Sequence, residues 1–183
     1  MVLKDFEPTV GDCIFTYQNS WLNKEIMWFS KWRVPKDRKE KIAHVAMYIG
    51  NDTKGDPLVF EADWKGLSVN SGLGYNNKKF IIHVASPKNI LPDPYHISKL
   101  HMYIASNLKT RYAFFQLAGI AVKKILGLHR VGDWDEHAMI CSECYCETLK
   151  YVWNVIITEN QEGITPLDIY YSDKMLIKHP EEE

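Results

Sequence analysis

The hydrophobic pattern changes once along the chain, and the change separates a strand-rich first part from a helical second part. Short apolar, β-prone runs bounded by turn residues predict strands over 13–17, 42–50, 58–64, 66–70 and 80–85. After Pro92 and Pro94, apolar residues recur at helical spacing and predict helices over 98–108, 114–126 and 141–158. Strands followed by helices are typical of an α+β domain, so we expect an antiparallel sheet packed against helices.

The segments between and after these elements carry weaker patterns, and the segment 21–32 could be a short helix or a loop with buried aromatic residues. The aromatic-rich segment 21–32 is expected to form a wall of a cleft, and the basic segment 33–41 a solvated loop. The segment 164–170 is expected to be extended or turn-like and to close over the core. No stretch suggests a linker, so residues 1–183 are predicted to form a single domain.

Composition excludes few classes of function, but it bears on the partners and the cellular compartment that we expect for the protein. The 183 residues are 46% hydrophobic and 25% charged, as in ordinary globular proteins, and the net charge of -1 gives no sign of a nucleic-acid partner. No run approaches the roughly 18 apolar residues of a membrane helix, and the N-terminus has no secretory apolar region. We therefore expect no integral membrane segment and a cytoplasmic location. Three of the four cysteines, at 13, 141, 144 and 146, are crowded together, which favours a reducing compartment over a disulfide framework.

Cys141 lies at the point where irregular chain is predicted to become a helix. The positive end of the helix dipole favours the thiolate, which is the reactive form of cysteine. A buried cysteine that only packs is the simpler interpretation of one such residue. The nucleophile interpretation therefore requires a base elsewhere in the chain.

His44 and Glu61 are the polar exceptions in two neighbouring apolar strands. Burying an imidazole or a carboxylate is costly unless a partner holds it. Adjacent strands lie about 4.8 Å apart, so these side chains can meet if they share a face. Glu61 would then orient the ring and leave its second nitrogen free for a thiol.

Cys141, His44 and Glu61 together have the composition of a nucleophile, a base and an orienting residue. The backbone N–H of Cys141, at a helix start, is suited to bind a developing oxyanion. Candidates for the second oxyanion donor follow the first strand: Tyr17, Gln18 or Asn19.

The order of these motifs resembles the circularly permuted papain-like enzymes. The matching segments are Gly11-Asp12 before a strand, 43–50 around His44, 59–62 around Glu61, and Cys141-Ser142-Glu143. That group includes the YaeF/YiiX-type amidases and the lecithin–retinol acyltransferases, with NlpC-type cell-wall peptidases as unpermuted relatives. The segment 165–168 is similar to the family's closing segment. The resemblance implies a permuted papain-like, NlpC-like fold with Cys141 as nucleophile, His44 as base and Glu61 as orienter.

The resemblance also implies the chemistry, without a cofactor or a metal. It implies hydrolysis of an amide in a peptide or cell-wall peptide through an acyl-cysteine. A lipid acyl hydrolase or acyltransferase is the alternative, although the acyltransferase branch has histidine where this chain has Glu61. Without an export signal, a cell-wall role would require lysis or delivery by a phage particle. The sequence does not indicate an oligomeric state.

Two rival interpretations use the same residues. Cys13, His137, Cys141, Cys144 and Cys146 could supply zinc ligands, although the second paired knuckle of a strong zinc signature is missing. The chain could also be a binding or structural protein without activity, because a fold does not fix a function. Cys144 and Cys146 are expected to be core residues, since they cannot both share the helix face of Cys141.

Overall fold

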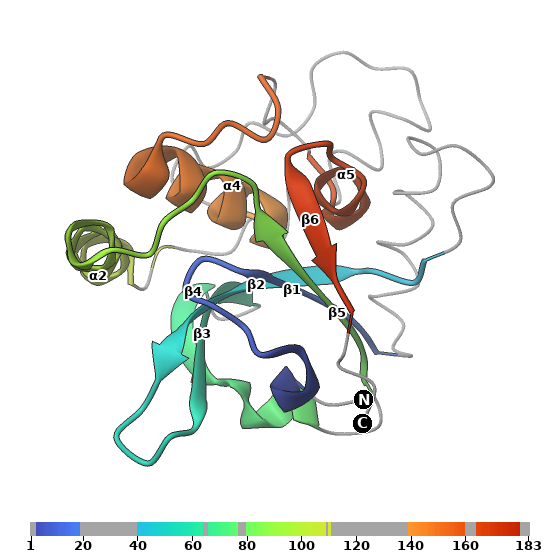
Figure 1. Ribbon diagram of the computed structural model, residues 1–183, viewed down its shortest axis with the longest axis horizontal. Helices are drawn as coiled ribbons and strands as arrows, with labels where there is room; N and C mark the ends of the chain where they lie inside the picture. Colours follow the sequence, from blue (N-terminus) through green and yellow to red (C-terminus); the bar gives the residue numbers. More distant parts are fainter. Residues whose placement is uncertain are drawn as a thin grey trace.

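Six strands form one antiparallel sheet in the order β4-β3-β2-β1-β5-β6, and the helices pack around it (Figure 1). The computed structural model describes residues 3–18, 40–63, 66–76, 80–108, 110, 139–159 and 164–179. The elements are η1 (Leu3–Phe6), β1 (Cys13–Gln18), β2 (His44–Asn51), β3 (Pro57–Asp63), β4 (Gly66–Ser71), η2 (Gly72–Asn76), β5 (Phe80–Pro87), α2 (Pro94–Asn107), α4 (Cys141–Trp153), α5 (Pro166–Tyr170) and β6 (Met175–Lys178). The predicted α+β class and antiparallel sheet are therefore confirmed.

The sheet is covered on both faces, which explains why its central strands are apolar throughout. On one side, α2, α4 and α5 cover the larger core cluster, which contains Phe15, Val45 and Phe60. On the other side, η1 and η2 lie over a smaller cluster that contains Ile14, Tyr48 and Val59 (Figure 1). Residues of β2 alternate between the two clusters, so a polar side chain in this strand requires a local partner.

Helix α4 begins at Cys141 and lies against β2 and β3. Its core side includes Cys144, Tyr145 and Leu149, which are at most 2% exposed. It ends at Trp153, because Asn154 adopts a left-handed conformation with φ 56° and its N–H caps the last turn. The prediction that this helix continues to Thr158 was therefore wrong.

The Gly11-Asp12 motif is a structural junction that anchors the first strand. Gly11 has φ +98°, and a Cβ there would lie 2.6 Å from the Ile90 side chain, so glycine is required. The Asp12 side chain is fully buried and accepts hydrogen bonds from the backbone N–H of Thr9 and the hydroxyl of Ser86. Its carboxylate also pairs with Lys178 Nζ at 2.7 Å, which ties β6 to the start of β1.

Several predicted boundaries differ from the structure. Helix α2 starts at Pro94 instead of Ser98, because Asp93 caps it and proline suits its first turn. The segment predicted as extended forms α5, whose N-cap is Thr165, and β6 was not predicted. The predicted helix over 114–126 and the aromatic segment 21–32 lie outside the described residues.

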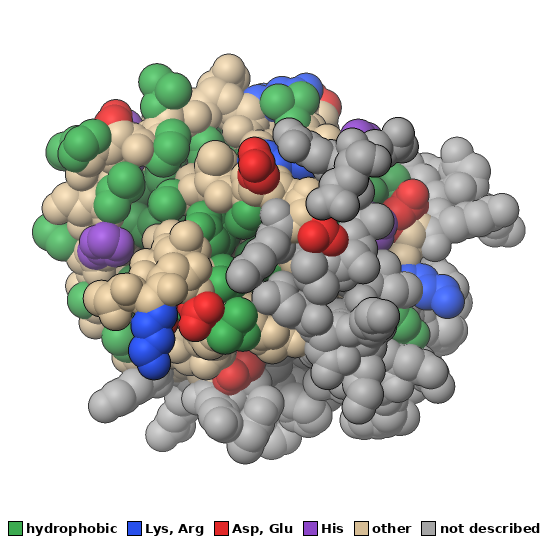
Figure 2. Space-filling view, turned by 60° about the horizontal axis from the view of Figure 1, so that its bottom comes forward, with side chains coloured by type: hydrophobic (Ala, Val, Ile, Leu, Met, Phe, Trp, Pro, Cys, Tyr) green, Lys and Arg blue, Asp and Glu red, His purple; other side chains and the backbone are tan. Residues whose placement is uncertain are grey.

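Two surface features concern possible partners. Within the described ranges, no helix has the length and apolar composition needed to cross a membrane. Figure 2 shows one face of the molecule, on whose described part Lys and Arg side chains are scattered among acidic and hydrophobic ones. A basic stripe of the kind that follows a nucleic-acid backbone is not visible on that described part.

Candidate active site

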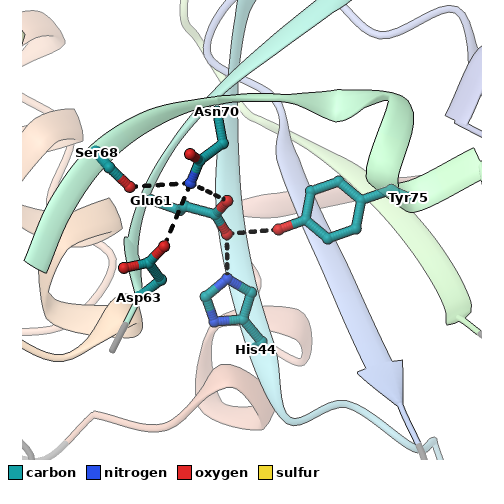
Figure 3. A network of polar contacts seen from close by, with 6 residues as sticks. All are labelled: His44, Glu61, Asp63, Ser68, Asn70 and Tyr75. Carbon is teal, nitrogen blue, oxygen red and sulfur yellow. Dashed lines mark hydrogen bonds and ion pairs between the residues drawn. The ribbon is translucent and has the colours of Figure 1, made fainter. Parts of the chain in front are cut away.

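His44 and Glu61 are in direct contact, as the sequence predicted. His44 starts β2, Glu61 lies in β3, and His44 Nε2 is 2.6 Å from Glu61 Oε2 (Figure 3). The register Met47↔Phe60 brings both side chains to the same face of the sheet, one diagonal step apart. The side chain of Glu61 is 8% exposed and that of His44 is 21% exposed, so solvent reaches the ring more than the acid.

Two further side chains hold the Glu61 carboxylate, and the sequence analysis did not identify either of them. Asn70 Nδ2 donates to Glu61 Oε1 at 2.9 Å, and the Tyr75 hydroxyl donates to Oε2 at 2.5 Å (Figure 3). Asn70 Nδ2 also lies 2.9 Å from the Ser68 hydroxyl oxygen. Together with the imidazole, these donors engage both oxygens of the acid and fix its orientation.

The surrounding donors keep Glu61 ionised. Burial by itself would raise the pKa of the carboxyl group, but the contact with His44, followed by the hydrogen bonds from Tyr75 and Asn70, lowers it below its usual value. An ionised carboxylate can only accept hydrogen bonds. His44 Nε2 must therefore carry its proton toward Glu61, which leaves Nδ1, on the far side of the ring in Figure 3, for another partner.

Cys141 is the further group that acts on the ring, because its charge and side chain change the pKa of His44. Burial would lower the pKa of His44, but the charge and hydrogen bond of Cys141, followed by those of Glu61, raise it to about 10. The structure thus brings together all three side chains that the sequence singled out.

The N-terminus of α4 is open toward an anion at Cys141. Its N-cap is Ile140, which has no side-chain acceptor to occupy the N–H groups of the first turn. Glu143 reaches back to accept from the backbone N–H of Ile140 at 3.2 Å, outside the helix itself. The Cys141 N–H and the helix dipole are thus available to a negatively charged oxygen or sulfur.

The remaining cysteines differ from Cys141 in their surroundings. Burial raises the pKa values of Cys13, Cys144 and Cys146, so these groups remain thiols at neutral pH. All four cysteines are free. Among them, Cys141 is the one whose charge and side chain raise the pKa of His44.

The predicted second oxyanion donors remain predictions. Tyr17 lies in β1 next to Thr16, the residue that pairs with His44, but its ring packs against the larger core cluster. The side chain of Gln18 and the whole of Asn19 lie outside the described residues. Tyr75 and Asn70 escaped the sequence analysis because only the register Glu61↔Ser68 and the fold of η2 bring them to Glu61.

A thiol, an imidazole and a carboxylate in this order can form an ion pair and transfer a proton to a departing group. They define a site with the chemical parts of a cysteine nucleophile, held on an α+β scaffold. No protein-family model matches the chain, and no curated protein matches it in sequence.

Among solved structures, the chain is similar to one described as the crystal structure of metalloprotein yiiX from Escherichia coli O157:H7, DUF1105. The TM-score is 0.65 at 14% sequence identity, and the similarity covers 97% of this chain and 99% of that chain. At this identity the similarity shows the fold alone. A YiiX-like fold, one of those implied by the order of the sequence motifs, is thereby confirmed.

Proposed function

We propose that this protein is a cysteine hydrolase of the permuted papain-like type, which cleaves an amide bond through an acyl-enzyme. The observation that carries the proposal is the pairing of His44 with Glu61, together with the effect of Cys141, whose charge and side chain raise the pKa of the same ring. A neutral core histidine would need neither an ionised acid nor a thiol at a helix N-terminus. The order of the motifs along the chain agrees with this class.

In the proposed reaction, the Cys141 sulfur attacks the carbonyl carbon of the substrate. The oxygen becomes negatively charged and is bound by the Cys141 N–H at the start of α4. His44 donates its proton to the leaving amine as the carbon–nitrogen bond breaks, which leaves a thioester on Cys141. His44, now neutral, takes a proton from water, and the resulting attack releases the acid and restores the thiolate.

Glu61 acts in this scheme through His44 and does not touch the substrate. It keeps Nε2 protonated, so that Nδ1 faces the sulfur, and it stabilises the imidazolium. Asn70 and Tyr75 act one step further away, by holding the carboxylate in its ionised form. The proposed machinery therefore consists of one nucleophile, one acid–base group and three positioning residues.

The substrate is proposed to be a peptide or cell-wall peptide amide, and a lipid acyl ester is the alternative. The acid at the orienting position favours the amide-cleaving branch of the resemblance. The test is to incubate the protein with peptidoglycan fragments and, separately, with acyl esters, and to detect the acyl adduct on Cys141 by mass spectrometry. Adducts from the fragments support the amide proposal, whereas adducts from the esters alone would transfer it to lipid substrates.

Two variants control the experiment. Cys141→Ala should abolish both adduct and turnover, while Cys146→Ala, which changes a buried cysteine on the same helix, should retain both. Iodoacetamide near neutral pH provides a test without a substrate. Cys141 should react far faster than Cys13 or Cys144, whose raised pKa values keep them protonated. Equally slow labelling of all four cysteines would favour a binding protein without activity.

A metal site is the other function to weigh, because the structurally similar protein is titled a metalloprotein. Among the residues described, no group of three or more His, Cys, Asp or Glu side chains could hold a metal ion. Of the zinc ligands considered from the sequence, His137 lies outside the described residues. The described side chains thus do not fit a metal centre, and we route no step through one. Elemental analysis that found one equivalent of zinc would contradict this.

A further inference from the structure

A second thiol lies beside Cys141 on α4. Cys141 and Cys144 occupy the first and fourth positions of the helix, and residues three apart are neighbours on a helix surface. Both are largely buried, at 5% and 2% exposure. Besides burial, the charge of Cys141 raises the pKa of Cys144, whereas the charges that raise the pKa of Cys146 come from Glu147, Glu143 and Asp168. Cys144 is thus the helix thiol that neighbours Cys141, three residues further along α4.

The first turn of α4 must tighten before a disulfide can form between Cys141 and Cys144. A disulfide requires Cβ atoms about 3.5–4.5 Å apart, and residues three apart in a helix place them at about 5–6 Å. The difference must be absorbed by the first turn. That turn is the least constrained part of the helix, because its initial N–H groups have no helical partners. The bond from Cys144 N–H to the Ile140 carbonyl, at 2.9 Å, closes this turn.

We propose that Cys144 is a resolving cysteine that forms a reversible disulfide with Cys141 when a peroxide oxidises the nucleophile. The inference rests on the proposed function in one respect, namely that Cys141 is a reactive thiolate. The arrangement of an activated cysteine followed three residues later by a buried thiol, at the start of a helix, is one that supports such exchange.

The proposed oxidation has two steps, the formation of a sulfenic acid on Cys141 and its displacement by Cys144. The Cys141 thiolate attacks one peroxide oxygen, the O–O bond breaks, and Cys141 becomes a sulfenic acid while the other oxygen leaves as hydroxide. The Cys144 thiol gives up its proton, and its sulfur attacks the Cys141 sulfur and displaces the hydroxyl group. The S–S bond forms, and the two hydroxides become water by taking the proton from Cys144 and the proton that Cys141 released when it became a thiolate. The peroxide is reduced by two electrons, and the two thiols are oxidised.

The disulfide has a protective consequence for the site. A sulfenic acid that is not resolved is oxidised further to sulfinic and sulfonic acids, which ordinary thiols do not reverse. A disulfide between Cys141 and Cys144 blocks the nucleophile but is reopened by a thiol reductant. Cys144 thereby makes the loss of the nucleophile reversible.

The experiment treats the full chain with hydrogen peroxide and maps the cysteines by mass spectrometry. Cleavage after Glu143 and after Tyr145 separates Cys141, Cys144 and Cys146 into different peptides, so a disulfide is seen directly as a linked pair. We expect the linked pair to contain Cys141 and Cys144. Iodoacetamide labelling of Cys141 should be lost with peroxide and recovered with dithiothreitol.

Matched variants decide the role of the second thiol. Cys144→Ser should lose the recovery and accumulate sulfinic acid on Cys141, whereas Cys146→Ser should behave as the natural chain. Cys144→Ala replaces the serine variant if that one fails to fold. Absence of the linked pair in the natural chain, with equal sulfinic acid formation in the natural chain and the Cys144 variant, would overturn the proposal.

These readouts are independent of turnover. A linked Cys141–Cys144 pair in a protein that hydrolyses no amide would leave this inference standing and remove the proposed reaction. Turnover with no linked pair would do the opposite. A pair between Cys13 and Cys146 would also overturn the assignment of Cys144.

Discussion

Replacing Tyr75 with phenylalanine tests whether the hydrogen bonds around Glu61 set its charge. The Tyr75 side chain is buried at 9% exposure, and its ring packs in the smaller core cluster, so phenylalanine preserves the packing and removes only the hydroxyl. That hydroxyl donates to Glu61 Oε2 at 2.5 Å. A hydrogen bond to a charged group contributes about 1.5–3 kcal/mol. At about 1.4 kcal/mol for each pKa unit, the loss of a bond of this strength is large enough to raise the pKa of Glu61 measurably.

The pH dependence of this variant has a definite sign. The pKa of Glu61 is lowered in the fold from its ordinary 4.5, so its stabilising contribution is present above 4.5 and is lost as the pH falls through the lower native value. In Tyr75→Phe the native pKa of Glu61 lies nearer 4.5, so the ionised carboxylate contributes less to stability and less is lost in acid. The difference in unfolding free energy between the two proteins should therefore be full at pH 7 and should shrink in acid.

The assay combines urea unfolding with carboxyl-carbon NMR titration of Glu61. Tyr48→Phe is the matched control, because Tyr48 lies in the same cluster but donates to the neutral Asn51 side chain at 2.9 Å. Tyr48→Phe should lower the free energy of unfolding by about 0.5–1.5 kcal/mol and leave the titration of Glu61 unchanged. If Tyr75→Phe and Tyr48→Phe give the same Glu61 pKa, the reasoning about the carboxylate is refuted.

Three further predictions concern charge. Glu61→Gln keeps a hydrogen-bond acceptor but removes the charge, so NMR titration should show a lower His44 pKa, with turnover weakened but not abolished; an unchanged pKa would exclude the orienting role. The pKa of His44 is raised from its ordinary 6.5 to about 10 in the fold, so its contribution to stability is full below pH 6.5 and is lost as the pH rises toward 10. The difference in unfolding free energy between the protein and His44→Gln should therefore shrink over that range. Asp12→Ala leaves Lys178 without its carboxylate and should cost about 3 kcal/mol in urea unfolding, while a loss below about 1 kcal/mol would show a surface-like pair.

The sequence was informative where a polar residue interrupts an apolar strand. His44 and Glu61 stood out because strands buried on both faces tolerate such groups only in pairs, and the two strands are joined by a short turn. Cys141 was recognisable because an apolar helical period begins at that residue. These signals are local, so they did not depend on knowing the tertiary structure.

The second layer of the site was not predictable in this way. Asn70 and Tyr75 reach Glu61 only after β3 and β4 adopt the register Glu61↔Ser68 and η2 folds back against the sheet. Polar residues in a partly exposed strand and in a turn are common, and nothing in their spacing distinguishes these two. The edge strand β6 was missed because a four-residue element leaves too short a pattern.

The position of the site in the chain has a consequence for its assembly. The strands that carry His44 and Glu61 are neighbours in both sequence and sheet, so their pairing closes only a small loop and can occur early in folding. Cys141 follows Glu61 by 141 - 61 = 80 residues and arrives with a helix that must dock from outside. A nascent chain can therefore pair His44 with Glu61 before the Cys141 thiol is in place, so the proposed activity would arise only in the last stages of folding.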